Sequence, residues 1–354
     1  MSGGRLLIVG GGQSGLAAAR AGLDRGWEPV ILEAGSEPVG SWPRYYDSLR
    51  LFSPRRFSAF PEHPFPGDPD GYPGRDEVVD YLRGYAEWLD IEIRTEARVV
   101  SVTAHGQAFT AEMADGSSIT GDALIAATGS FTDPHLPTIP RREAFEGRVL
   151  HVADYRSPEA FAGQRVLVAG AGNSAVQVAH ELADHAETSL AVRDRVHFAP
   201  QVIAGRDLHW WLSRTRADLL PPSVLRRIVN GTPVIDSGVY RSALEAGRPD
   251  QRPMFTAFVD DGVAWPDGKK EPVDTVVFAT GYRPQLPYLR SLGVLDGAGM
   301  PRHLRGVAAG QPGLGFLGLE FQRSFSSNTL RGVHRDAAYV VDALTRQPRG
   351  AVVG

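Results

Sequence analysis

The feature that most constrains the fold is a glycine-rich turn between an apolar run of strand length and a stretch typical of a helix. Residues 6–9 are all apolar, and Gly10, Gly12 and Gly15 follow in the spacing G-x-G-x-x-G. The first glycine permits a tight turn, the second lets a pyrophosphate approach the backbone, and the third lets helix and strand pack closely. The helix N-terminus adds free N–H groups and a partial positive charge. Glu33 ends the next apolar run, where an acidic residue can accept a hydrogen bond from a ribose 2′-hydroxyl.

The same pattern occurs a second time, which makes a chance glycine turn a poor explanation. Residues 166–169 are apolar, and Gly170, Gly172 and Ala175 repeat the spacing. Glu33 follows Gly10 by 23 residues (33 − 10), and Arg193 follows Gly170 by 23 (193 − 170). A carboxylate repels a phosphate, whereas a guanidinium can hold one. We therefore expect one site for a dinucleotide with a plain ribose and a second for NADPH. The alternatives are that one copy is only a packing turn and that Arg193 forms a surface salt bridge with its neighbour.

The repeat extends beyond the two turns. Residues 123–129 and 275–281 both have the pattern of a buried strand, and both end in Ala-Thr-Gly. Each follows an alternating stretch, at 98–120 and 254–265, that predicts a small antiparallel meander. The order strand, glycine turn, helix, strand, meander and Ala-Thr-Gly strand thus occurs twice. The sequence predicts an α/β protein with two related dinucleotide-binding domains.

Composition restricts the remaining possibilities. A chain of 354 residues with a net charge of −4 gives no bulk electrostatic reason to bind nucleic acid, and it has no apolar run long enough to span a membrane. The N-terminus leads directly into the first strand, so we expect a cytoplasmic protein without a signal peptide. The absence of cysteine excludes an internal dithiol that could pass electrons on. The ten histidines show no metal-ligand spacing, so we expect no metal site.

Residues 34–75 form a long stretch rich in proline, glycine and aromatic side chains. A connection of this length is usually functional, so we expect it to lie over a cofactor; the alternative is an irregular surface excursion. Residues 76–90 have apolar positions at helical spacing. Trp210 and Trp211 also fall in a helical pattern, which favours a packed helix over a substrate entrance.

Residues 145–155 spell F-x-G-x-x-x-H-x-x-x-Y, with Phe145, Gly147, His151 and Tyr155 at the defined positions. With this fingerprint the sequence resembles the class B flavin-dependent monooxygenases. It is most similar to the group that includes the plant auxin-forming YUCCA enzymes and bacterial flavoproteins. Further matching segments are residues 189–194, 278–282 and 328–333.

The resemblance implies the two-dinucleotide-binding, glutathione-reductase-like fold, with two Rossmann-like domains. We expect a FAD-binding domain made of residues 1–157 and 284–354, with an NADPH-binding domain at 158–283 inserted between them. The implied reaction is transfer of one oxygen atom from O₂, through a flavin C4a-(hydro)peroxide, to a soft nitrogen or sulfur or to a carbonyl carbon of a small organic substrate. The alternatives are a flavin oxidoreductase that passes electrons on without inserting oxygen, and a redox-sensing flavoprotein. The sequence does not fix the oligomeric state, and a homodimer is one possibility.

The candidate site residues follow from the motifs and the resemblance. His151 is a candidate for coupling NADPH binding to the flavin site; the alternative is a structural linker. Phe52 and Ser53 stand in a loop where many animal and yeast relatives carry an asparagine near the flavin, which leaves efficient oxygenation open. The final helix, expected at 329–345 with Asn328 as N-cap, would direct its N-terminus at the flavin ring. The residues expected to contact cofactors are Gly10, Gly12, Gln13, Ser14, Gly15, Glu33, Trp42, Thr128, Gly129, Gly170, Gly172, Asn173, Ser174, Ala175, Arg193, Thr280, Gly281, Asn328, Thr329 and Leu330.

Overall fold

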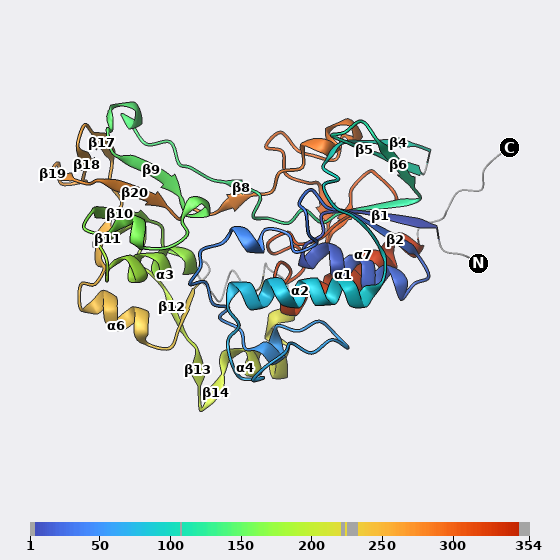
Figure 1. Cartoon of the computed structure of the whole chain (residues 1–354), viewed down its shortest axis with the longest axis horizontal. Coiled ribbons are helices and arrows are strands. Elements are labelled where there is room, and N and C mark those ends of the chain that lie inside the picture. The colour runs from blue at the N-terminus through green and yellow to red at the C-terminus, as the bar shows by residue number, and fades with distance from the viewer. Residues whose placement is uncertain (1–3, 107, 221–223, 225–232, 347–354) are drawn as a thin grey trace.

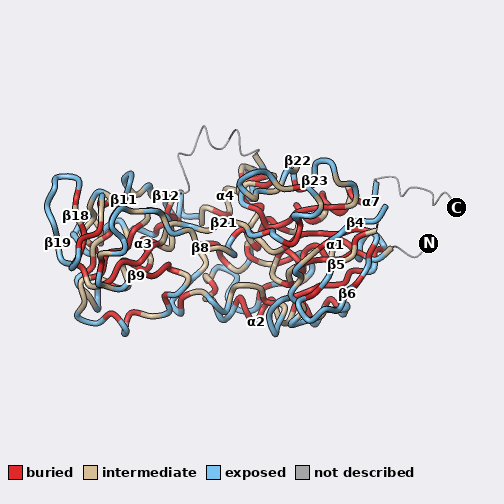
Figure 2. The backbone as a smooth tube through the Cα atoms, turned by 90° about the horizontal axis from the view of Figure 1, so that it is seen from above, coloured by how far each residue is buried: buried red, intermediate tan, exposed pale blue. Residues whose placement is uncertain are grey.

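The computed structural model describes residues 4–106, 108–220, 224 and 233–346. Two α/β lobes lie side by side, each built around a mainly parallel sheet (Figure 1). Buried residues run through the middle of both lobes, and exposed residues follow the outer loops (Figure 2). The predicted pair of Rossmann-like domains is confirmed.

The first sheet has the strand order β22-β23-β24-β7-β1-β2-β3. Side chains of β1 alternate between its two faces, as the two-residue period of a strand requires. Leu6 and Ile8 pack with the helices α1, α2 and α7, whereas Leu7 and Val9 pack with the meander β4-β5-β6. The bounds are β1 Arg5–Val9, α1 Gln13–Leu23, β2 Glu28–Leu32, α2 Arg75–Leu89, β3 Glu92–Arg94, β4 Val99–His105, β5 Ala108–Met113, β6 Ser118–Gly121, β7 Ala123–Ala126, β22 His303–Leu304, β23 Val307–Ala308, β24 Leu314–Phe316 and α7 Leu330–Arg346.

The second sheet repeats this plan with the order β16-β11-β10-β20-β9, and all its pairs are parallel. The helix α3 packs on one face, and the meander β17-β18-β19 covers the other. The bounds are β9 Arg148–His151, β10 Arg165–Ala169, α3 Asn173–Leu182, β11 Glu187–Val192, α6 Val239–Glu245, β16 Asp250–Pro253, β17 Ala257–Val259, β18 Gly262–Ala264, β19 Lys270–Pro272 and β20 Thr275–Phe278.

A smaller excursion leaves the second lobe between β11 and β16 and reaches under the first lobe (Figure 1). It contains β12 Phe198–Pro200, β13 Val202–Ile203, β14 Arg206–Asp207, α4 Leu208–Thr215, the 3₁₀ turn η6 Ala217–Leu219 and β15 Val234–Asp236. The expected helix around Trp210 and Trp211 is therefore present as α4. No helix within the described parts of the chain is both long and apolar enough to cross a bilayer.

The chain crosses between the lobes twice, and the two crossings pair with each other. β8 (Asp133–Pro134) and β21 (Tyr282–Arg283) form a short antiparallel ladder between the lobes. The expected boundary at 157 is wrong for residues 148–151, because β9 pairs with β20 in the second sheet. The sequence places this segment before the second glycine turn, so it was assigned to the first domain. Its hydrogen-bonding partner is β20 of the second sheet.

Candidate cofactor and active site

The first glycine turn, residues 10–15, follows β1 and leads directly into α1. Gly10 has φ of +104°, and a Cβ there would lie 2.8 Å from the carbonyl oxygen of Ala127. A Cβ on Gly15 would lie 1.9 Å from the Gly10 oxygen, so both positions require glycine. The described helix α1 has no side-chain cap and no acidic residue in its first turn. Its first N–H groups are therefore available to an anion.

Glu33 lies beside this turn, immediately after β2. Its side chain is buried, and the carboxylate accepts hydrogen bonds from Gly11 N at 2.6 Å and Gly35 N at 2.7 Å. Gly12 faces a second glycine across the turn, because a Cβ on Gly12 would lie 3.2 Å from the Gly40 Cα. Because Gly12 has no side chain, the backbone of the long loop (residues 34–75) can approach the turn at Gly40, and the turn itself stays open.

Three expected cofactor residues from distant segments meet at the start of α1. Gln13 donates from Nε2 to the Asn328 carbonyl oxygen at 2.7 Å, and its Oε1 accepts from Trp42 Nε1 at 3.2 Å. The N-cap of α7 is Thr329, because α7 begins at Leu330 and Val333 N donates to the Thr329 oxygen. The expectation that Asn328 caps this helix is wrong by one residue.

The ends of the neighbouring strands close the floor of the same region. Gly129, after β7, has φ of +76°, and Thr128 Oγ1 lies 3.4 Å from the Tyr288 hydroxyl. Ser14 is buried against Gly318, where a Cβ would lie 2.2 Å from the Ser14 Oγ. The small residues at the strand ends therefore lie close to the start of α1, as a close-fitting dinucleotide site requires.

The second glycine turn, residues 170–175, repeats this geometry in front of α3. Gly170 has φ of +151°, and a Cβ there would lie 2.4 Å from the Ala279 oxygen. A Cβ on Gly172 would meet nothing within 4 Å, so the space before α3 is open. Ala175 is buried under the turn and Ser174 is half-buried beside it. The described helix α3 also lacks a side-chain cap and an acidic residue in its first turn.

Arg193 directly follows β11 and lies at the surface. Its side chain is exposed, and no salt bridge joins it to Asp194 or to another residue in the described ranges. Asn173, at the start of α3, accepts from Ile235 N at 3.3 Å through its Oδ1 and so holds β15 beside the turn. A guanidinium with no carboxylate partner at this position is available to a phosphate.

His151 ends β9 in the second sheet, and both of its ring nitrogens have backbone partners. It is 2% exposed; its Nδ1 accepts from Ala153 N at 3.1 Å, and its Nε2 lies 3.0 Å from the Gly281 oxygen. Because Nδ1 accepts, Nε2 carries the proton and donates it to Gly281. Burial lowers the pKa of His151, which keeps the ring neutral. Thr280 donates from Oγ1 to the His135 oxygen in the same junction.

The described contacts of Phe52 and Ser53 are with their own loop and with the excursion that carries α4. Ser53 Oγ is buried and lies 2.8 Å from Ser58 Oγ, and the Phe52 ring stacks on His209 with centroids 5.9 Å apart. The Phe52 carbonyl oxygen accepts from Gln201 Nε2 at 2.9 Å. In the described structure Ser53 therefore holds its own loop together, and Phe52 borders the excursion that carries α4.

The long loop spans both lobes, which its sequence did not reveal. Tyr46 donates to Gln177 Oε1 of α3 at 2.5 Å and packs in the core of the second lobe. Tyr72 donates to Asp207 Oδ2 at 2.6 Å. In the sequence, only the aromatic residues of the loop hinted at these contacts with the second lobe, because their partners lie more than 100 positions away.

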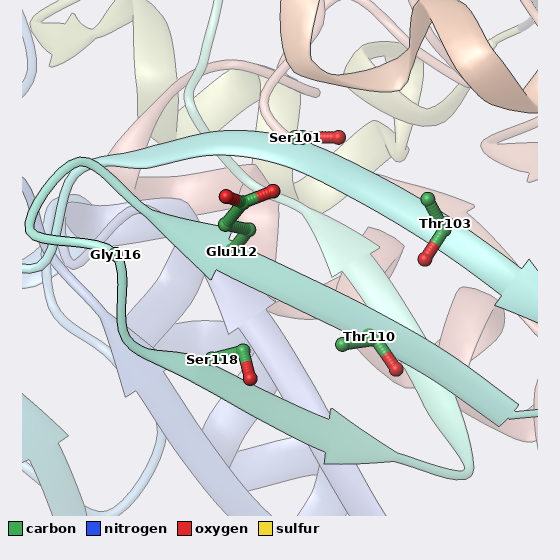
Figure 3. Close-up of a pocket in the computed structure, with 6 residues that line it drawn as sticks. All are labelled: Ser101, Thr103, Thr110, Glu112, Gly116 and Ser118. Carbon is green, nitrogen blue, oxygen red and sulfur yellow. The ribbon is translucent and has the colours of Figure 1, made fainter.

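A shallow cavity of about 270 Å³ lies on the outer face of the meander β4-β5-β6. Figure 3 shows its lining, which consists of the hydroxyl groups of Ser101, Thr103, Thr110 and Ser118, the Glu112 carboxylate and Gly116. None of the expected site residues borders it. The second cavity, about 150 Å³, lies between the long loop, α4 and the first turns of α7. The described residues contain no cluster of His, Asp and Glu that could hold a metal ion.

Known proteins resemble this chain over nearly its whole length. Residues 7–212 match the family model described as pyridine nucleotide-disulphide oxidoreductase. An uncharacterized CzcO-like oxidoreductase of Geobacillus kaustophilus is 30% identical, over 95% of this chain and 97% of that protein. The indole-3-pyruvate monooxygenase YUCCA1 of Oryza sativa subsp. japonica is 32% identical, over 82% of this chain and 79% of that protein.

Among solved structures, a flavin-containing monooxygenase from Stenotrophomonas maltophilia is 30% identical with a TM-score of 0.84, and the match covers 98% of this chain and 99% of that one. A bacillithiol disulfide reductase from Staphylococcus aureus, 19% identical with a TM-score of 0.73, shares the fold. The chain therefore belongs to the pyridine nucleotide-disulphide oxidoreductase family and, within it, to the class B flavin-dependent monooxygenases, which use FAD and NADPH.

Proposed function

We propose that the first glycine turn binds the pyrophosphate of FAD and the second that of NADPH. The observation that carries this assignment is the opposite charge at equivalent positions of two equivalent turns. Glu33 is buried beside the first turn, where it would repel a 2′-phosphate, and Arg193 is exposed beside the second, with no carboxylate partner among the described residues. The cofactors fit the residues present, since both helix N-termini are uncapped and the space at Gly172 is open.

The remaining site residues bind, orient and exclude water. FAD, reduced by NADPH, supplies the oxygen-activating chemistry when it is bound. Gln13 holds Trp42 and Asn328 at the start of α1, and the N-terminus of α7 at Thr329 and Leu330 would stabilise negative charge on the flavin. His151 acts as a positioning residue that ties β9 to Gly281 between the lobes.

The substrates are O₂ and a small organic molecule with a soft nitrogen, a soft sulfur or a carbonyl carbon. We place the enzyme in the cytoplasm. The two parts of the FAD-binding domain are the N-terminal segment up to β8 and the segment after β21, with the NADPH-binding domain between them.

A matched pair of glycine variants tests the assignment. Gly12→Val should yield protein without FAD, because the side chain crowds Gly40 and the pyrophosphate path. Gly172→Val should fold and retain FAD, because its Cβ enters open space, but NADPH should no longer reduce the flavin. The measurements are the flavin absorbance of the purified proteins and the rate of flavin bleaching by NADPH without O₂. FAD retained in Gly12→Val, or normal reduction of Gly172→Val, would contradict the assignment.

A further inference from the structure

The hairpin β13–β14 and the segment that follows it expose apolar side chains that the cofactor sites do not use. Val202 and Ile203 of β13 are 54% and 38% exposed, and Leu219 of η6 is 42% exposed. Trp210 and Trp211 of α4 are partly exposed. In Figure 1 the hairpin lies at the lower edge of the molecule, outside the cores of both lobes. An apolar surface that projects into solvent in this way marks an interaction site.

Contacts between the hairpin and α4 hold these side chains together as one surface. Trp211 donates from Nε1 to the Ile203 carbonyl oxygen at 2.9 Å, and the Trp210 and Trp211 rings meet edge to face with centroids 4.7 Å apart. Arg206 pairs with Ile203 across the hairpin, and its guanidinium lies 5.5 Å from the centre of the Trp210 ring. We call the surface formed by residues 202–206, 210, 211, 214, 216 and 219 the hairpin patch.

The exposed charges of the hairpin patch are all positive. They belong to Arg206, Arg214 and Arg216. The acidic residues between positions 202 and 219 are Asp207 and Asp218, whose side chains are only 13% and 3% exposed and already have partners. Because the whole chain has a net charge of −4, this positive charge is local. The patch therefore complements a partner that is both negatively charged and apolar.

The base of the hairpin is fixed to the long loop of the first lobe. Gln201 donates from Nε2 to the Phe52 carbonyl oxygen at 2.9 Å and to Asp207 Oδ2 at 2.8 Å. Tyr72 of the long loop donates to the same Asp207 oxygen at 2.6 Å. The hairpin patch thus stands on an ordered base, and a preformed surface loses little conformational freedom when it binds.

The residue types of the hairpin patch suit the boundary between water and hydrocarbon. Tryptophan has an apolar body and a polar N–H group, which favours the level of the lipid headgroups. Arginine keeps its guanidinium in the polar layer while its stem covers apolar surface. At about 3.3 Å per residue, the two residues of β13 span roughly 7 Å, which is the depth that interfacial elements reach.

A second copy of this chain fits the hairpin patch less well. In a two-fold symmetric dimer the patch would meet the same patch of the partner, so the three arginines of each copy would face one another. Like charges brought together in an interface oppose association. An anionic bilayer has no such conflict, because its phosphates attract arginine and its acyl chains accept apolar side chains.

We propose that the hairpin patch binds the surface of an anionic lipid bilayer. Val202 and Ile203 enter the boundary of the acyl chains, and Arg206, Arg214 and Arg216 contact the lipid phosphates. The association is peripheral, so both lobes stay in water. It does not depend on the proposed function, because none of these residues belongs to the two cofactor sites.

Co-sedimentation of the FAD-loaded enzyme with vesicles tests the proposal. The vesicles contain phosphatidylcholine alone or an equal mixture of phosphatidylcholine and anionic phosphatidylglycerol. The enzyme should bind the anionic vesicles at least tenfold more tightly, and added salt should weaken this binding. Ile203→Glu should weaken it at least tenfold, because a carboxylate is unfavourable in hydrocarbon and is repelled by the lipids. Leu304→Glu, at a position 75% exposed on β22, is the matched control and should change the affinity less than twofold.

The arginines are tested separately from the apolar residues. One arginine near an anionic surface contributes about fivefold in affinity, so replacement of all three by glutamine should weaken binding about a hundredfold at low salt. The same replacement at three exposed arginines of the first lobe should change the affinity less than threefold. The patch variant combines Arg206→Gln, Arg214→Gln and Arg216→Gln, and the control combines Arg98→Gln, Arg290→Gln and Arg305→Gln.

Lipids brominated on their acyl chains report which side chains reach the bilayer, because bromine quenches tryptophan fluorescence only at short range. Vesicles with brominated phosphatidylglycerol should quench part of the fluorescence of the enzyme, and Trp210→Phe should remove a share of that quenching. Trp88→Phe is the control, since Trp88 is 44% exposed on α2 and should stay in water. This measurement decides the question if Ile203→Glu does not fold.

Several results would overturn the membrane proposal. These are equal binding to neutral and anionic vesicles, unchanged binding by Ile203→Glu, equal weakening by Leu304→Glu, and no quenching by brominated lipid. An enzyme dimer that Ile203→Glu converts to monomers in sedimentation velocity would identify a second copy as the partner instead. Binding to polyglutamate as tight as to anionic vesicles, and unaffected by Ile203→Glu, would identify an acidic protein surface.

Discussion

Glu33 and Arg193 carry opposite charges at equivalent positions, and the structure gives them opposite surroundings. Glu33 is buried and accepts from two backbone N–H groups, so its carboxylate has a fixed orientation beside the first glycine turn. Arg193 is exposed and makes no salt bridge in the described ranges. A fixed carboxylate suits a constant hydroxyl partner, whereas a free guanidinium suits a phosphate that arrives with the coenzyme.

Replacement of Arg193 by alanine should therefore separate the two nicotinamide coenzymes. Loss of a charge-assisted contact to the 2′-phosphate costs roughly 1.5–3 kcal/mol, which corresponds to about ten- to hundredfold in KM for NADPH. KM for NADH should change less than about threefold. Arg195→Ala, two residues further along the same exposed segment, is the control. Equal effects on both coenzymes, or an equal effect of Arg195→Ala, would show that Arg193 is not the phosphate ligand.

At the scale of elements, α1 and α3 begin with the same turn but contact different partners. Gln13 and Asn173 both stand three residues after the first glycine of their turn. Gln13 joins Trp42 of the long loop to the residue before the N-cap of α7, whereas Asn173 holds β15. Residues at equivalent positions therefore hold different segments beside the two glycine turns: the long loop and the start of α7 in the first lobe, and β15 in the second.

Gln13→Ala should loosen FAD and spare NADPH, and Asn173→Ala should do the reverse. Each change removes about 1 kcal/mol of hydrogen bonding, which leads us to expect roughly a five- to tenfold weaker affinity for the coenzyme of its own lobe. FAD dissociation followed by flavin fluorescence and KM for NADPH are the two readouts. If either variant weakened the binding of FAD and of NADPH equally, the prediction that each residue serves only the coenzyme of its own lobe would be wrong.

At the scale of the whole molecule, several buried or half-buried histidines have a lowered pKa. Burial lowers the pKa of several histidines that lie in different parts of the chain, namely His63, His151, His209, His303 and His334. A histidine with a depressed folded-state pKa contributes no stability difference above the unfolded value near 6.5. Below that value the unfolded chain binds protons that the folded protein does not. Stability therefore falls as the pH falls from about 6.5 toward the folded-state pKa values.

We expect the melting temperature of the FAD-loaded enzyme to fall by several degrees between pH 7 and pH 5. The His334 pKa is lowered to about 4, mainly by burial, so His334→Gln should remove up to about 2 kcal/mol of the loss at pH 5 and flatten the profile. His105→Gln, at an exposed position, should leave the profile unchanged. The measurement is thermal unfolding followed by flavin fluorescence. A melting temperature that stayed constant or rose on acidification would contradict the prediction.

The parts that could be predicted from the sequence are those whose cause is local. Short continuous apolar runs and the positions of Gly10, Gly15 and Gly170 predict both strand–turn–helix units, because these contacts join residues that are near in the chain. The segment at 148–151 could not be assigned this way, because its strand acquires a partner only when β20 is in place. Phe52 and Ser53 were expected near the flavin from the resemblance alone, and this stays a prediction; only the tertiary structure shows their contacts, which are with His209 and Ser58.

The sequence by itself determined the two dinucleotide-binding units, the opposite charges at Glu33 and Arg193, and the family. All of these follow from the spacing of residues along the chain, which can be read without knowledge of the tertiary contacts. Only the tertiary structure brought Arg331, His209 and Asp218 around one cavity and showed which of their polar atoms have no hydrogen-bond partner within the described ranges. Burial and hydrogen-bond pairing belong to the packed chain, because they depend on neighbours that the order of residues does not name.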